Sequence, residues 1–170
     1  MLEQEHWEII HTPEFKRLKN IKQLGPTWMN IPDASHSRFE HCIGTYNVAR
    51  DLIEILKFNQ GNEIEFDHFY TRNVMTAALS HDLGHGPFSH TFDNNFMQKR
   101  FPELNWCHEK CSVDLFEYMI DRNNIELYEK EDIQMVQDLI IGKPSRSSKF
   151  LNLCVNLQFY RKFSFVLKFS

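Results

Sequence analysis

Residues 37–58 read SRFEHCIGTYNVARDLIEILKF, and their pattern is that of one long amphipathic helix. Apolar side chains recur every three or four positions, at Phe39, Cys42, Ile43, Tyr46, Ala49, Ile53 and Leu56. This spacing places them on one face of an α-helix. Ser37 and Glu40 stand three residues apart at its start, which is the form of a capping box. The segment predicts a helix that buries one face against other helices.

Helical signals also dominate on both sides of this segment. Pro13 starts a shorter helix that Gly25-Pro26 ends, and Asp67 caps one that runs to His81. Further helices are expected from Asn105 onward and over residues 131–141, the latter closed by Gly142. Strand signals are weak before residue 150. The fold class is therefore predicted to be all-α, a compact helical bundle.

Length and charge favour a single domain followed by a different tail. The chain has 170 residues, enough for one domain, and no run of about 20 apolar residues that would span a membrane. All 23 acidic residues lie within residues 1–142, whereas residues 143–170 carry six of the 19 basic residues. We expect a domain over 1–142 and an irregular or strand-like, basic and aromatic tail over 143–170, with alternation over 163–169. The acidic start, MLEQEH, lacks the apolar core of a signal peptide, which predicts an intracellular protein of nucleus or cytoplasm with reduced cysteines.

Histidines gather in two short segments, residues 36–41 and 81–90. Residues 81–90 read HDLGHGPFSH, with three histidines and an aspartate at the end of a predicted helix. Imidazole and carboxylate groups are ligands for borderline divalent metals, and inward residues on facing helices can build such a site. His41 lies beside the apolar face of the long helix and supplies a further inward ligand. Arg38 precedes it by one turn, which favours an anionic substrate such as a phosphate.

A second arrangement is a zinc site at Cys107, His108 and Cys111. This set lacks a fourth ligand and a partner pair, so two core thiols are the preferred interpretation of the cysteines.

These motifs resemble the HD-domain metal-dependent phosphohydrolases. The strings HTPEFKRL (11–18), IKQLG (21–25), ASHSRFEH (34–41) and HDLGHGPFSH (81–90) are similar to those of the SAM-and-HD-domain deoxynucleoside triphosphate triphosphohydrolases. The similarity continues through WCHE (106–109) and EDI (131–133), and covers roughly residues 9–142.

The resemblance implies an HD-domain bundle that hydrolyses a dNTP to a deoxynucleoside and inorganic triphosphate. It implies one divalent ion, of Mn, Fe, Mg or Zn, held by three residues: His41, His81 and Asp82. It implies substrate binding by Gln23 and Leu24 at the deoxyribose and by Arg38 at the phosphates. Its catalytic histidines correspond to His85, His90 and His108, one of which protonates the leaving oxygen or positions water.

The chain departs from this family pattern at several points. The fourth metal ligand of the family, an Asp beyond the matched region, and the SAM domain have no counterpart in residues 1–170. His11, Lys16 and Lys19 replace residues that read a guanine activator. With three ligands, we expect weak or no dNTP hydrolysis by this chain alone, and exposure of residues 139–141 that favours association.

Three alternatives remain open at this level. The chain is an inactive relative that binds nucleotide or joins full-length subunits; it is another HD phosphohydrolase, such as a nucleotidase or phosphodiesterase; or its basic tail contacts nucleic acid by charge. Self-association into a homo-oligomer is compatible with each of them.

Overall fold

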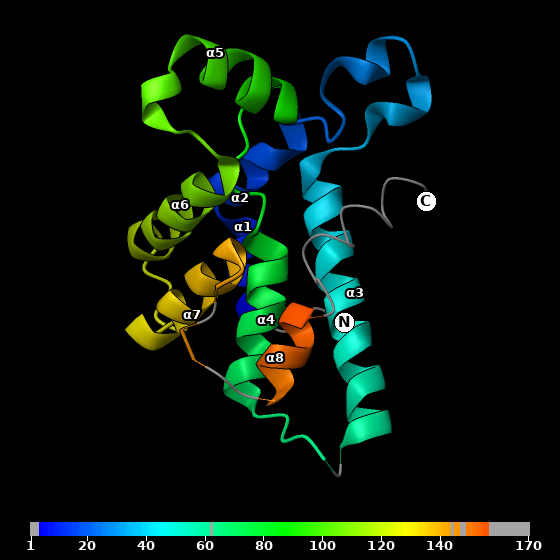
Figure 1. Cartoon of the computed structure of the whole chain (residues 1–170), viewed down its shortest axis with the longest axis vertical. Helices are drawn as coiled ribbons and strands as arrows, with labels where there is room; N and C mark the ends of the chain where they lie inside the picture. The colour runs from blue at the N-terminus through cyan, green and yellow to red at the C-terminus, as the bar shows by residue number, and fades with distance from the viewer. Residues whose placement is uncertain (1–3, 62, 144, 147–148, 157–170) are drawn as a thin grey trace.

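Two antiparallel helices form the centre of the computed structural model. Helices α3 (Arg38–Gln60) and α4 (His68–Ser80) lie side by side along the long axis of the molecule (Figure 1). The structure describes residues 4–61, 63–143, 145–146 and 149–156. The capping box is confirmed: the Ser37 hydroxyl accepts from the N–H of Glu40, whose carboxylate accepts from the N–H of Ser37. Because the helices run in opposite directions, the start of α3 and the end of α4 meet at one end of the pair.

Two more helices complete the bundle on one side of α4. Helix α6 (His108–Arg122) packs on α7 (Lys130–Ile141), and α7 packs on α4. A buried polar contact supports the latter interface, since the Asp132 carboxylate accepts from Asn73 at 2.9 Å and pairs with Arg72. Gly142 ends α7 in the left-handed region, at φ +76°, as its position in the sequence predicts.

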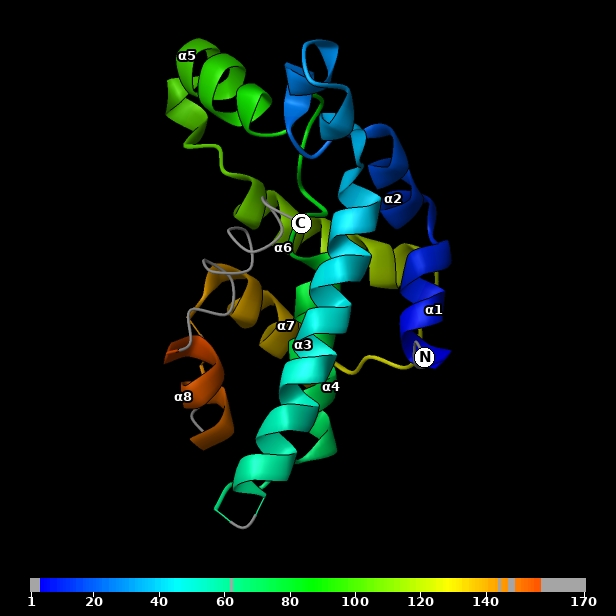
Figure 2. The same ribbon diagram turned by 90° about the vertical axis from the view of Figure 1, so that its right-hand side faces the viewer.

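Helices α1 (Gln4–His11) and α8 (Lys149–Asn156) lie on opposite faces of the α3–α4 pair (Figure 2). Part of the expected irregular tail is therefore helical, because Phe150 and Leu151 are fully buried and the Phe150 ring packs edge-on against Phe66 at 5.3 Å. The alternating stretch 163–169 lies outside the described residues. The division at residue 142 stays a prediction.

The expected exposure of residues 139–141 is wrong for two of the three. Leu139 and Ile140 are 1% and 5% exposed, because they belong to the face of α7 that packs into the core, and Ile141 alone is open at 42%.

Short elements cap the end of the bundle where α3 begins (Figure 1). In the view of Figure 2, α2 (Pro13–Lys16), η1 (Arg17–Asn20), η2 (Gly25–Met29) and η3 (Pro32–Ser35) lie on one side, and the π-helix η4 (Phe92–Met97), α5 (Gln98–Arg100) and η5 (Pro102–Leu104) lie on the other. The helix expected from Asn105 starts three residues later, because Asn105 adopts a left-handed conformation at φ 44°.

The described residues contain no strand, only an isolated bridge between Lys22 and Ser37, so the all-α class is confirmed. Within this same part of the chain, no helix combines the length and the apolar character needed to cross a membrane.

Candidate metal and catalytic site

A tight turn at the end of α4 carries the first part of the site. The helix ends at Ser80, and the turn that follows is closed by hydrogen bonds from Leu83 N–H to the Ser80 carbonyl and from His85 N–H to the Asp82 carbonyl. It places His81 and Asp82 against His41 in the first turn of α3, forty residues away in the sequence. Because α3 and α4 are antiparallel, this convergence follows from the hairpin itself.

His41, His81 and Asp82 present their ligand atoms to one point. His41 Nε2 lies 3.3 Å from His81 Nε2 and 3.3 Å from Asp82 Oδ2, and His81 Nε2 lies 3.3 Å from Asp82 Oδ1. The Nδ1 of His81 is 2.9 Å from the Ala78 carbonyl, which only accepts, so Nδ1 carries a proton. In the neutral ring the Nε2 lone pair then faces the cluster. This second contact is the kind that orients metal-ligating histidines.

Burial sets the charge state of this group. It lowers the pKa of His41 to about 4, against the opposing effect of the Asp82 carboxylate, so His41 is neutral near pH 7. Burial alone would raise the pKa of Asp82, but His81 and Arg38 hold it well below its ordinary value. Two imidazole nitrogens and a carboxylate lie so close together that one shared proton cannot serve as a hydrogen-bond donor to all of their lone pairs. A divalent cation fits this donor set, since it accepts all three at once.

Arg38 lies directly behind the carboxylate. Its guanidinium pairs with Asp82, donates from Nε to the Ser89 hydroxyl at 2.9 Å, and donates from Nη2 to the Gln23 carbonyl at 3.3 Å. The side chain is almost completely buried. Arg38 thus joins the start of α3 to both the turn after α4 and the segment that contains Gln23.

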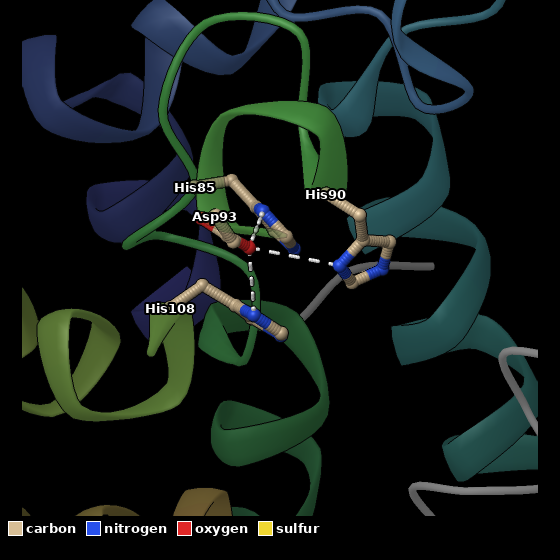
Figure 3. Close-up of side chains that lie close together, drawn as sticks. All are labelled: His85, His90, Asp93 and His108. Atoms are coloured by element: carbon tan, nitrogen blue, oxygen red, sulfur yellow. Dashed lines mark ion pairs between the residues drawn. The ribbon is translucent and has the colours of Figure 1, made fainter. Parts of the chain in front are cut away.

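Three histidines surround a second carboxylate, Asp93. The Nδ1 atoms of His108, His85 and His90 lie 3.2, 3.3 and 3.6 Å from Asp93 Oδ2 (Figure 3), while Trp106 donates to Oδ1 at 3.0 Å. Although burial opposes it, these contacts hold the pKa of Asp93 below its ordinary value, and the group stays ionised. With Nδ1 turned to the carboxylate, each ring is left with Nε2 for other contacts.

Local backbone geometry produces this arrangement. Phe88 and Ser89 both have positive φ, 62° and 55°, which turns the chain sharply just before His90. Such conformations are costly for residues other than glycine and concentrate at functional sites. The Ser89 hydroxyl donates to the Lys22 carbonyl at 2.6 Å and so stabilises the turn. The π-helix that follows places Asp93 inward.

His85 connects the two groups of side chains. Its Nε2 lies 3.4 Å from Asp82 Oδ1, its Nδ1 faces Asp93, and its ring stacks on His108 at 3.8 Å between centroids. The side chain is fully buried, and burial lowers its pKa despite both carboxylates. His108 is 17% exposed and His90 58%, so the open side of the cluster is on His90.

The remaining expected residues lie nearby or elsewhere. Gln23 is tied to Arg38 through its carbonyl, and its side-chain Oε1 is buried without a hydrogen-bond partner among the described residues. Leu24 follows it, half-buried, just before η2. Within the described chain, the groups that bring three ligand atoms together include His108 but neither Cys107 nor Cys111, which argues against the zinc arrangement.

Asp93 is the functional candidate that sequence reasoning missed. Its only local signal is the spacing of three from His90, which on a helix faces the two side chains toward each other.

Comparison with known proteins matches this region. The HD domain family model matches residues 38–150. The deoxynucleoside triphosphate triphosphohydrolase SAMHD1 of Mus musculus is 41% identical over 143 residues, covering 80% of this chain and 22% of the mouse protein. The Homo sapiens protein of the same name is 43% identical over 141 residues, covering 79% of this chain and 22% of its own length. The uncharacterized protein YwfO of Bacillus subtilis is 44% identical over 91 residues, 53% of this chain and 20% of that protein. The chain thus spans under a third of the length of each of these relatives.

Proposed function

The chain belongs to the HD domain family, and from that membership we propose that its site hydrolyses deoxynucleoside triphosphates to a deoxynucleoside and inorganic triphosphate. The observation that carries the proposal is the pairing of two clusters: a His–His–Asp group suited to a divalent cation, and a carboxylate that holds three histidines beside it. The name of the SAMHD1 relatives supplies the substrate class.

We propose that His41, His81 and Asp82 hold the cation. The support is the shared point of their ligand atoms, the neutral state of His41 and the fixed Nδ1 proton of His81. A bound divalent ion supplies Lewis acidity toward phosphate oxygens and offsets their charge. Three donors from the described residues suit Zn, Mn, Fe or Mg, so the metal is left open.

His108 is the proposed proton donor. Its Nδ1 makes the shortest of the three contacts to Asp93, at 3.2 Å, and the carboxylate orients the ring. In the hydrolysis, water oxygen bonds to the α-phosphorus while the bond from that phosphorus to the 5′-oxygen breaks. His108 delivers a proton to the leaving 5′-oxygen. The attacking water loses one proton as it bonds to phosphorus, so the total number of protons is unchanged.

His85 and His90 complete the catalytic group in this proposal. Neutral His85 contacts both Asp82 and Asp93 and so fixes the position of one cluster relative to the other. The exposed His90 faces solvent, where it positions water or phosphate.

Substrate contacts are assigned to three residues around the turn. Arg38 is proposed for the phosphates, where an anionic substrate would compete with Asp82 for the guanidinium. Gln23 and Leu24 are proposed for the deoxyribose, and the Oε1 of Gln23, which has no partner among the described residues, is an acceptor that a sugar hydroxyl can satisfy.

Metal-dependent triphosphate release by the purified chain tests the proposal. With dGTP and saturating Mn²⁺, we expect release that EDTA abolishes, that His81→Ala abolishes, and that His108→Asn lowers by about a hundredfold or more. His68→Asn is the matched control, because His68 is an exposed histidine at the opposite end of α4. Nucleotide binding without release would instead favour the inactive relative, and equal release by His81→Ala would contradict the metal assignment.

A further inference from the structure

The turn that carries His81, Asp82 and His85 lies directly on the first turn of α6. A Cβ atom built on Gly84 would lie 2.3 Å from the His108 carbonyl oxygen and 2.4 Å from the Ser112 nitrogen. Backbone therefore meets backbone at this point, with no room for a side chain. Because α6 begins at His108, this contact sets where that histidine stands relative to His81.

One side chain joins the two backbones across this contact. The Ser112 hydroxyl donates to the His81 carbonyl at 2.7 Å and accepts from the Gly84 N–H at 2.8 Å. Ser112 is completely buried, and it lies one helical turn after His108. Its hydroxyl thus holds both ends of the segment 81–84 against the helix that carries the proposed proton donor.

We propose that Ser112 is a positioning residue that fixes the separation and relative orientation of His81 and His108 in the site. The inference rests on the proposed function, because it assigns Ser112 no contact with substrate and no role apart from the two histidines. A hydroxyl that both donates and accepts at this place fixes separation and orientation, which an apolar side chain of the same size does not. Small displacements matter here, since a misplacement of about 1 Å in a catalytic group can lower a rate on the order of a hundredfold.

A second anchor keeps the turn folded when Ser112 is changed. The Arg17 guanidinium donates to the carbonyls of His85, at 2.9 Å, and Leu83. The backbone of the turn is thus held by Ser112 from α6 and Arg17 from η1, and its Asp82 side chain is held by Arg38 from α3. Removing the Ser112 hydroxyl is expected to shift the turn relative to α6 and leave the protein folded.

Ser80 provides a matched control. It is also completely buried, at the end of α4 next to His81, but its hydroxyl has no hydrogen-bond partner among the described residues. Ser80→Ala removes the same atom as Ser112→Ala without removing a hydrogen bond.

The test compares imidazole ¹⁵N–¹H spectra and kinetics of the 170-residue chain and its variants. In Ser112→Ala we expect the ring signals of both His81 and His108 to shift, and kcat for triphosphate release to fall about tenfold or more with KM within about twofold. Ser80→Ala should leave the His108 ring signals and kcat unchanged. Signals are assigned with His81→Gln and His108→Gln.

Each outcome decides the proposal. Unchanged His108 signals in Ser112→Ala, or equal shifts of these signals in Ser80→Ala, overturn it. If Ser112→Ala does not fold, Ser112→Cys retains the approximate volume with a weaker hydrogen-bonding group, and the same ring signals decide. A wild-type chain that releases no triphosphate refutes the proposed function, while the metal-free spectra still test Ser112.

Discussion

Replacing Gly84 by alanine places one methyl group where two backbones touch. The new Cβ would stand 2.3 Å from the His108 oxygen, whereas ordinary contact begins at 3.4 Å, so the turn and α6 must separate by about 1 Å. The Ser112 hydrogen bonds of 2.7 and 2.8 Å do not survive such a separation. Overpacking costs about 1–3 kcal/mol and each lost hydrogen bond about 1 kcal/mol, so the free energy of unfolding should fall by roughly 3–5 kcal/mol.

Urea unfolding monitored by circular dichroism measures this loss, and triphosphate release measures its effect on the site. Gly142→Ala is the control, because a Cβ at Gly142 meets no atom of the described residues within 4 Å and adds the strain of its φ of +76°. We expect that control to lose about 1–2 kcal/mol and to keep its activity. A Gly84→Ala chain within about 1 kcal/mol of wild type, or one less affected than Gly142→Ala, would refute the packing argument.

Two other residues give independent predictions. Burial lowers the pKa of His6 to about 4. Between pH 6.5 and 4 the unfolded chain therefore binds a proton at this residue that the folded chain does not bind. The contribution of neutral His6 to the free energy of unfolding is complete above pH 6.5 and falls by about 3 kcal/mol as the pH drops to 4. Urea unfolding at pH 7 and pH 4 should show this difference shrink in His6→Gln, and an equal pH dependence in both chains would contradict it. Asp93→Asn removes the charge that orients three histidines, so we expect kcat for triphosphate release to fall about a hundredfold or more. Mn²⁺ affinity, measured by titration, should stay near that of wild type, and a matching loss of affinity would show that Asp93 belongs to the metal site.

Where local signals agree with one another, the sequence predicts the structure well. The long helix α3 has its apolar spacing and its capping box, and the structure starts it at Arg38. The same periodicity places His41 on an inward face, and the antiparallel hairpin then brings it to His81 and Asp82. The close backbone contact at Gly84 is also predictable from the sequence, because glycine allows two backbones to approach closely.

Features that depend on distant contacts could not be predicted. Asp93 faces His108 only because Phe88 and Ser89 adopt positive φ and a π-helix follows. Neither the positive φ values nor the π-helix produces a repeating pattern in the sequence. Residues 149–156 have the composition of a tail, yet Phe150 packs on Phe66, more than eighty positions earlier. Packing of this kind overrides local propensity, so a single sequence does not show it.

Hydrolysis of dGTP in H₂¹⁸O with saturating Mn²⁺ tests the central claim most directly. Attack of water on the α-phosphorus puts the solvent oxygen into the triphosphate and leaves the 5′-oxygen on the sugar. The account predicts slow, metal-dependent formation of deoxyguanosine and inorganic triphosphate, with one ¹⁸O atom in the triphosphate and none in the deoxyguanosine, as mass spectrometry would show. No product at saturating metal would favour the inactive relative, whereas pyrophosphate or orthophosphate as the product, or ¹⁸O in deoxyguanosine, would contradict the account.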